Sequence, residues 1–191
     1  MINKPIDIIN FTRNVSSDRY FKNHSKYKVI CVDFDNTICI DEWPYVGSII
    51  KDAVKVLKEL VNNGHKLILF TQRTKNYPIC CSELEEYADM NGKSFSSELQ
   101  CETVDILTPA INICKHYDID FISYNTNAEW EMSTHDNSRK IFSDYVIDDH
   151  NVGMKYIIVR NSMQKMCKVC DWKFIDEWCV QEGLYNKNVC S

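Results

Sequence analysis

KVICVDFDNT, residues 28–37, is the stretch that decides the fold. Its first half is a short apolar run rich in β-branched residues, which is typical of a strand buried on both faces of a sheet. Its second half places Asp33, Asp35 and Thr37 directly after that strand. Because an Asp-x-Asp after a strand is most often a turn or a helix cap, its meaning depends on what the other strands carry.

Helical and strand patterns alternate through the rest of the chain. Apolar spacing predicts a helix over 48–62 with a stop at Asn63-Gly64, and another over 105–117. Buried strands are expected over 66–70, 119–124, 145–147 and 156–159, and a closing helix from Asp171 or Trp172. This alternation predicts an α/β domain, a Rossmann-like three-layer sandwich around a mainly parallel sheet of about five strands.

The chain of 191 residues has room for one such domain. Residues 1–26 are mixed and polar and are interpreted as an N-terminal extension, followed by the domain over 27–191. Residues 75–104 interrupt the alternation and contain a helix-prone run at 82–90. That stretch is either a small helical insert near the site or the start of the next crossover helix.

The composition is that of an ordinary globular protein, with 45% hydrophobic and 26% charged residues. A net charge of −5 does not attract nucleic acid or anionic lipid over a long range, so a nucleic-acid partner is possible but not favoured. No segment approaches the roughly 20 apolar residues of a membrane span. The first ten residues do not resemble a signal peptide either. We therefore expect an intracellular, cytoplasmic protein with no membrane contact.

Ten cysteines allow two interpretations, a disulfide framework or free thiols in a reducing compartment. Free thiols are favoured because disulfide frameworks suit small secreted chains. Cys167 and Cys170 form the one metal-like pair, and there is no second tight pair to complete a zinc site. We interpret them as two cysteines at a surface turn before a helix.

Polar groups follow three of the expected strands. Ligands of parallel sheets bind beyond the carboxyl ends of the strands, so these groups should lie at one edge. The second strand ends in Thr71-Gln72-Arg73 and the fourth in Asp148-Asp149, with Lys140 shortly before it. Together with Asp33 and Asp35 they place four carboxylates, a hydroxyl and a lysine at that edge.

This set of groups points to phosphoryl transfer. Four carboxylates repel one another unless a cation joins them. Ligands that are all oxygens select a hard ion, and Mg²⁺ suits a site with few protein ligands, waters and a phosphate. Thr71 and Lys140 could hold the oxygens of a transferring phosphoryl group, and a carboxylate is an accepted nucleophile for it.

The order of these groups resembles the haloacid dehalogenase-like (HAD) superfamily. Its first motif, Asp-x-Asp-x-Thr after an apolar strand, matches residues 33–37, and its paired acids match Asp148-Asp149. Its strand-terminal Thr and its lysine match Thr71 and Lys140. The resemblance covers roughly residues 28–160. Residues 38–47 and 125–139 are too short for a cap domain, so the chain is similar to small capless phosphatase-like members.

The resemblance implies a mechanism. Asp33 attacks phosphorus to form an aspartyl phosphate, and Asp35 first protonates the leaving group and then takes a proton from water. Mg²⁺ is held by the side chains of Asp33 and Asp148 and by the backbone carbonyl of Asp35. Asp149 supports the metal through water or orients Lys140. An acid at position 35 favours hydrolysis of a phosphate monoester, because an alkoxide leaving group must receive a proton.

The substrate is less defined. Rim loops offer tentative contacts, and Arg73 could clamp a second phosphate or carboxylate or form a structural salt bridge instead. A small phosphate ester and a macromolecular end both fit an open site, and the oligomeric state is undetermined. The tentative substrate contacts are Asn36, Gln72, Arg73, Asn125 and Asn127.

Two other functions use the same residues. A phosphotransferase would pass the phosphoryl group of the same aspartyl phosphate to an acceptor alcohol. A catalytically silent scaffold would bind Mg²⁺ or phosphate without turnover. The presence of every expected group favours the phosphatase over the scaffold.

Overall fold

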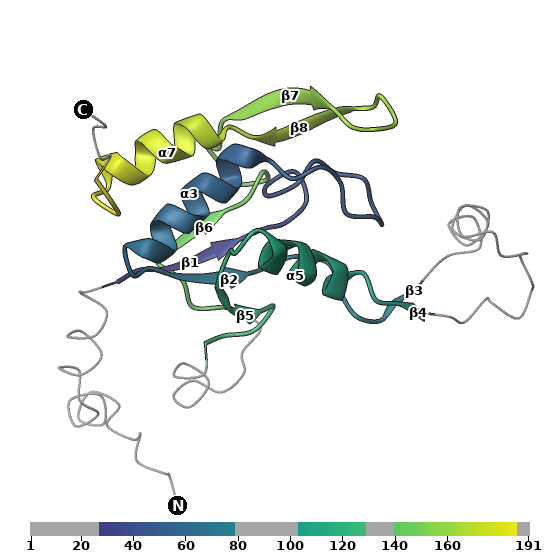
Figure 1. Cartoon of the computed structure of the whole chain (residues 1–191), viewed down its shortest axis with the longest axis horizontal. Coiled ribbons are helices and arrows are strands. Elements are labelled where there is room, and N and C mark those ends of the chain that lie inside the picture. The colour runs from purple at the N-terminus through teal and green to yellow at the C-terminus, as the bar shows by residue number, and fades with distance from the viewer. Residues whose placement is uncertain (1–26, 79–102, 129–139, 187–191) are drawn as a thin grey trace, which may run out of the picture.

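The computed structural model describes residues 27–78, 103–128 and 140–186. Within them four parallel strands form the central sheet, in the order β5-β2-β1-β6 (Figure 1). The strands are β1 (Val29–Val32), β2 (Lys66–Leu69), β5 (Phe121–Tyr124) and β6 (Tyr145–Ile147). The strand that carries the deciding motif therefore lies inside the sheet, with a neighbour on each side.

β1 is buried on both faces, as its apolar run predicts. Ile30 and Val32 are fully buried on one face, and Val29 and Cys31 are 1% exposed on the other. Successive side chains of a strand point to opposite faces, so the four residues split between two hydrophobic clusters. Within the described ranges, the smaller cluster is completed by Ile68 and by packing from Tyr27, Ile122, Ile141 and Phe142.

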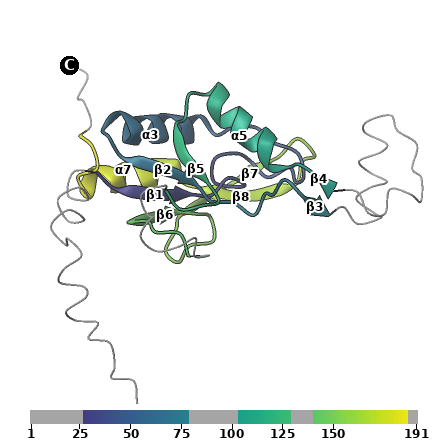
Figure 2. The ribbon, with the colours of Figure 1, turned by 90° about the horizontal axis from the view of Figure 1, so that it is seen from below.

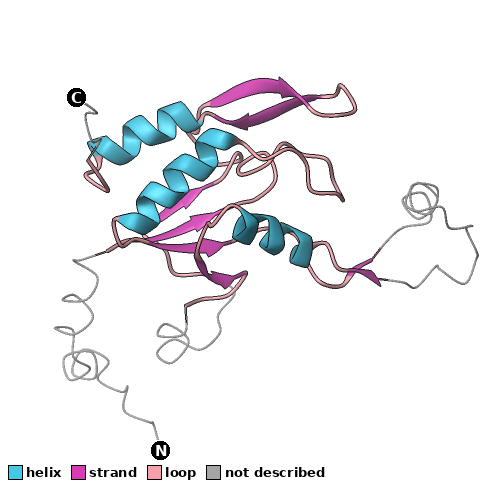
Figure 3. Cartoon of the chain, viewed as in Figure 1, coloured by secondary structure: helices cyan, strands magenta, loops and turns pink. Residues whose placement is uncertain are grey.

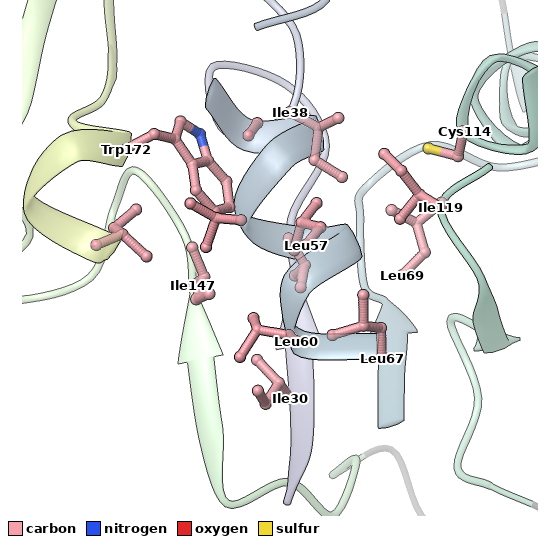
Figure 4. Close-up of a cluster of buried hydrophobic side chains, with 14 of the residues drawn as sticks. Ile30, Ile38, Leu57, Leu60, Leu67, Leu69, Cys114, Ile119, Ile147 and Trp172 are labelled. Carbon is pink, nitrogen blue, oxygen red and sulfur yellow. The ribbon is translucent and has the colours of Figure 1, made fainter. Parts of the chain in front are cut away.

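The larger cluster joins three helices to the other face of the sheet (Figure 4). The helices are α3 (Lys51–Asn62), α5 (Leu107–His116) and α7 (Trp172–Gln181). Figure 2 shows α3 and α5 lying over the sheet. α3 ends at Asn62, and Asn63 caps it. Gly64 follows with φ +90°, a left-handed conformation that glycine adopts readily. The predicted α/β sandwich with a mainly parallel sheet is confirmed, with four strands in place of about five.

The fifth expected strand is present, but it lies outside the central sheet (Figure 3). It is β7 (Tyr156–Arg160), which pairs antiparallel with β8 (Met166–Cys170) in a separate two-stranded sheet. The surface turn expected at Cys167 and Cys170 is wrong, because this segment pairs residue by residue with β7. Cys170 is fully buried, and both thiols are free.

The ends of the interrupting segment 75–104 lie against each other. β3 (Tyr77–Pro78) and β4 (Thr103–Val104) form a short antiparallel pair, and α5 begins only after it. The run at 82–90 and the extension 1–26 lie outside the described residues. Among the helices that the structure describes, none is long and apolar enough to cross a membrane.

The loop between β1 and α3 folds back on itself over one buried glycine. Ile40 N–H donates to the carbonyl of Ser48 at 2.9 Å, and Ile50 N–H donates to that of Ile38 at 2.9 Å. A Cβ at Gly47 would collide with the carbonyl oxygen of Ile40. The close approach of these two backbone segments therefore requires glycine at position 47.

We expect Gly47→Ala to lower the free energy of unfolding by about 1–3 kcal/mol, because the added methyl group forces the two segments apart. Urea denaturation followed by far-UV circular dichroism measures the change. Ser48→Ala, at an exposed neighbouring position, should stay within about 0.5 kcal/mol of wild type. Equal stability of the two variants would contradict the tight packing.

Candidate active site

A pocket of about 470 Å³ opens at the carboxyl ends of β1, β2 and β6. It brings together the four carboxylates that the sequence predicts for one edge of the sheet. Thr71, Asn36 and Gln72 line it as well. The complete lining is Asp33, Asp35, Asn36, Asp41, Trp43, Phe70, Thr71, Gln72, Asp148, Asp149 and His150.

Strand register places the two acidic motifs side by side. Val32 of β1 pairs with Ile147 of β6 in a parallel ladder. Asp33 N–H donates to the carbonyl of Ile147 at 2.9 Å, so the ladder continues one residue beyond the strand. Asp33 and Asp148 follow the paired residues directly and therefore emerge from adjacent strand ends.

The buried Thr37 side chain connects the motif that contains Asp33 with the motif that contains Asp149. It is fully buried, and Oγ1 donates to Asp33 Oδ2 at 3.4 Å. The same oxygen accepts the backbone N–H of Asp149 at 3.2 Å. The turn that aims Thr37 inward includes Asn36 at φ +56°, a region that Asn tolerates better than most residues. Sequence reasoning read Thr37 only as part of a motif and missed this bridging role.

Negative charge is concentrated in the pocket. Burial raises the pKa of Asp33 to about 7, and the neighbouring charges of Asp148, Asp35 and Asp149 act in the same direction against a hydrogen bond from the Phe34 backbone. Burial also raises the pKa of Asp149. His150 opposes that shift, with Nδ1 lying 2.9 Å from Asp149 Oδ1.

These groups fit a hard divalent cation. Potential ligand atoms of Asp148, Asp149 and His150 lie within 4.8 Å of one another. Burial is the main cause of the raised pKa of Asp33, and the charges of Asp148, Asp35 and Asp149 add to it; a cation bound here would relieve that repulsion. Carboxylate and carbonyl oxygens are the ligands that Mg²⁺ prefers. The carboxylates of Asp33, Asp35, Asp148 and Asp149 could therefore hold a divalent cation.

Arg73 does not lie on the rim and forms the structural salt bridge that was the alternative to a substrate contact. It is fully buried and forms a bidentate ion pair with Asp35, from Nε to Oδ2 at 2.8 Å and from Nη2 to Oδ1 at 2.7 Å. The guanidinium carbon also lies 5.1 Å from the ring centroids of both Phe34 and Trp43. Its remaining hydrogen bonds go to the backbone carbonyls of Pro44, Tyr45 and Ile106.

The two asparagines expected on rim loops also have structural partners. Asn125 Oδ1 accepts the Thr71 N–H at 2.7 Å, and Nδ2 donates to the Arg73 carbonyl at 3.0 Å. Asn127 is 5% exposed and accepts the Phe142 N–H at 2.7 Å. Neither lines the pocket, so their assignment as substrate contacts stays a prediction.

Lys140 is exposed and is not part of the pocket lining. Its backbone carbonyl accepts a hydrogen bond from Asn127 Nδ2 at 3.4 Å. Its role as a ligand of a phosphoryl oxygen stays a prediction.

The pocket wall contains four side chains that were not among the predicted site residues, one of them His150 beside the paired acids. Phe70 follows β2, and Asp41 and Trp43 come from the loop after the first motif. Asp41 Oδ1 accepts the Trp43 N–H at 2.9 Å, which is a local turn characteristic of aspartate. The position of this loop after the first motif was the one signal available, and it did not show which residues face inward.

Comparisons with known proteins support the fold. The chain is similar to a solved structure of a conserved protein from Bacteroides thetaiotaomicron, at 27% sequence identity and a TM-score of 0.52. The match covers 82% of this chain and 91% of that one. No family model and no curated protein matches the chain.

The raised pKa of Asp33 predicts a pH-dependent stability. In a chelator, the native protein should hold the Asp33 proton up to about pH 7, whereas an unfolded chain releases it near pH ~4. Because the native state then binds more protons, the free energy of unfolding should fall as pH rises from ~4 to 7, by up to ~1.4 kcal/mol per unit. Urea titrations across this range measure the slope. Asp33→Asn should remove this contribution, and Asp118→Asn, at a side chain that is 84% exposed, should keep it.

Removing the buried guanidinium should be costly. Arg73→Met leaves Asp35 without its counter-charge, and we expect a loss of about 3–5 kcal/mol in the free energy of unfolding. Lys58→Met is the matched control: it breaks an exposed pair with Asp118, 3.3 Å apart, and should lose less than about 1 kcal/mol. Urea denaturation compares the two. If Arg73→Met lowers the free energy of unfolding by no more than Lys58→Met does, the Arg73–Asp35 pair contributes little to stability.

Proposed function

We propose that this chain is a Mg²⁺-dependent phosphatase that hydrolyses a phosphate monoester through an aspartyl phosphate on Asp33, and that it is a capless HAD-like protein. The observation that carries the proposal is the convergence of Asp33, Asp35, Asp148 and Asp149 on one pocket. The open pocket of about 470 Å³ lies within the common range for small ligands. It also leaves room for the phosphorylated end of a larger molecule.

Asp33 is the proposed nucleophile. Thr37 holds Oδ2 by a hydrogen bond of 3.4 Å, so Oδ1 is the oxygen that remains for attack on phosphorus. A bond forms from Oδ1 to phosphorus as the ester P–O bond breaks. For this step Asp35 must enter in its protonated form; the leaving oxygen takes that proton, and the Asp35 carboxylate that results is the form paired with Arg73. Water next attacks phosphorus and gives a proton to Asp35, while the bond from Asp33 to phosphorus breaks.

Asp35 is held in place for this role. Its side chain is 19% exposed and lines the pocket, although both oxygens contact Arg73. Arg73 thereby acts as a positioning residue: it fixes the Asp35 carboxylate against the loop carbonyls of Pro44 and Tyr45. A fixed carboxylate reduces the reorganisation needed to meet the leaving oxygen.

Thr71 is the proposed phosphoryl-oxygen ligand. Thr71 Oγ1 accepts the backbone N–H of Arg73 at 3.3 Å. Since that bond uses the oxygen as an acceptor, the hydroxyl hydrogen can be donated to a phosphoryl oxygen. The Asn125 side chain holds the segment 71–73 in place, because it accepts the Thr71 N–H and donates to the Arg73 carbonyl.

Mg²⁺ would be held by the side chains of Asp33 and Asp148 and by the backbone carbonyl of Asp35. When bound, it supplies charge neutralisation for the carboxylates and the phosphoryl oxygens. Asp149 remains the candidate to support it through water. We place the activity in the reducing interior of the cell, which is consistent with the free thiols of all six cysteines in the described segments.

The decisive experiment measures phosphate release from an aryl phosphate with Mg²⁺ and with a chelator. Wild type should turn over only with Mg²⁺. Asp33→Asn should lower kcat by at least ~1,000-fold, because the amide cannot form the acyl phosphate. The matched control is Asp118→Asn, the same change at an exposed residue, which should keep wild-type activity.

A trapping experiment separates covalent from direct hydrolysis. Borohydride added during turnover should reduce an aspartyl phosphate to homoserine at position 33, detectable by peptide mass spectrometry. Turnover that survives in Asp33→Asn would overturn the mechanism. Mg²⁺ binding without turnover on any ester would instead favour the silent scaffold. Phosphate appearing on an added alcohol would favour the phosphotransferase.

A further inference from the structure

The β7–β8 hairpin presents an edge strand whose outer side has no partner in the described parts of the chain. β8 lies toward the body of the protein, where Cys170 N–H donates to the Asn36 carbonyl at 2.8 Å (Figure 1). β7 pairs with β8 alone. Exposed strand edges invite pairing with another strand, and proteins usually cover, shorten or charge them.

The hydrogen-bond pattern shows which residues of β7 face outward. Asp171 N–H donates to the Lys155 carbonyl at 2.9 Å, and Asn161 N–H donates to that of Lys165 at 3.0 Å. In an antiparallel ladder such hydrogen-bonded pairs recur at every second residue. The N–H and C=O groups of Ile157 and Val159 therefore face β8. Those of Tyr156, Ile158 and Arg160 face outward.

The same edge exposes apolar side chains. Tyr156 is 52% exposed, Ile157 47% and Ile158 49%. Tyr156 and Ile158 lie on one face of the strand and Ile157 on the other, so both faces of β7 contribute. A strand with apolar groups on both faces and an unpaired edge is suited to extension of the sheet by another strand.

We propose that a second copy of the chain pairs with this edge, β7 against β7 and antiparallel about a two-fold axis at Ile158. In this register Ile158 faces Ile158 of the second copy, and Tyr156 faces its Arg160. These are the three residues whose backbone groups point outward, so each pair can exchange two hydrogen bonds. On the other face, Ile157 meets Val159 of the second copy. The strand is thus complementary to itself, as a two-fold interface requires.

Three of the four basic residues of the hairpin contact groups of their own copy. Residues 154–170 contain four basic and no acidic side chains. Lys155 turns away, with Nζ lying 4.4 Å from the centroid of the Phe174 ring. Lys168 Nζ lies 4.8 Å from the centroid of the Tyr156 ring, and Arg160 Nη1 donates to the Gln164 carbonyl at 2.9 Å. The positive charges of the two hairpins still repel each other, and because salt screens this repulsion, the dimer should strengthen as salt is added.

Sedimentation velocity of the full chain over a range of concentrations tests the proposal. Wild type should form a dimer. Ile158→Lys and Ile158→Glu each place like charges opposite each other at the two-fold axis and should raise the dimer Kd by about 100-fold or more. Mixing the two variants should restore dimers, because the introduced lysine then faces the introduced glutamate. Val146→Lys is the matched control, since Val146 is 43% exposed on the edge strand β6, and it should dimerise as wild type does.

Three results would overturn the proposal. A wild-type chain that stays monomeric at all concentrations excludes the second copy. Amide hydrogen exchange then shows whether another segment of the same chain protects residues 156, 158 and 160, or whether the edge is open to a different protein. A dimer that survives in Ile158→Lys but is lost in Val146→Lys places the interface on β6. Folded variants that do not dimerise when mixed exclude the register centred on Ile158.

Discussion

The buried ion pair between Arg73 and Asp35 is the interaction on which the site depends. A guanidinium with no exposure to solvent requires a counter-charge and acceptors for its N–H groups. Asp35 supplies the charge, and carbonyls from the loop after β1 and from the start of α5 supply the rest. One side chain thus joins the first motif, the second strand end and the pocket wall. A polar centre of this kind constrains all three segments together, which apolar packing alone would not do.

The meeting of the acidic residues that follow β1 and β6 could be predicted from the sequence, because it depends on short-range patterns. The apolar run before Asp33 indicated a buried strand, and the run before Asp148 indicated another. Parallel pairing then requires the residues after both strands to meet. Arg73 could not be placed in this way. Arg73 lies four residues beyond β2, where an arginine is normally a rim residue. Its burial depends on acceptors from positions 35, 44, 45 and 106.

The separate hairpin was missed for a related reason. β8 alternates Met166, Lys168 and Cys170 with Cys167 and Val169, so neither face has the continuous apolar character of a core strand. The spacing of its cysteines drew attention to metal binding instead. Its strand conformation comes from pairing with β7 and from the contact of its last residue with Asn36. Both are tertiary effects, which override local preference in short strands.

The hairpin connects an outer surface to the pocket. Cys170 N–H reaches the Asn36 carbonyl, and Asn161 Nδ2 donates to the Asp41 carbonyl at 3.1 Å. Asn36 and Asp41 both line the pocket. A second copy on β7 would therefore add no residue to the site, but it would restrain the hairpin, whose inner strand contacts Asn36 and whose turn contacts Asp41. Because the proposed chemistry needs carboxylates held close together against their own repulsion, a more rigid support on this side would favour the arrangement of the pocket without changing its composition.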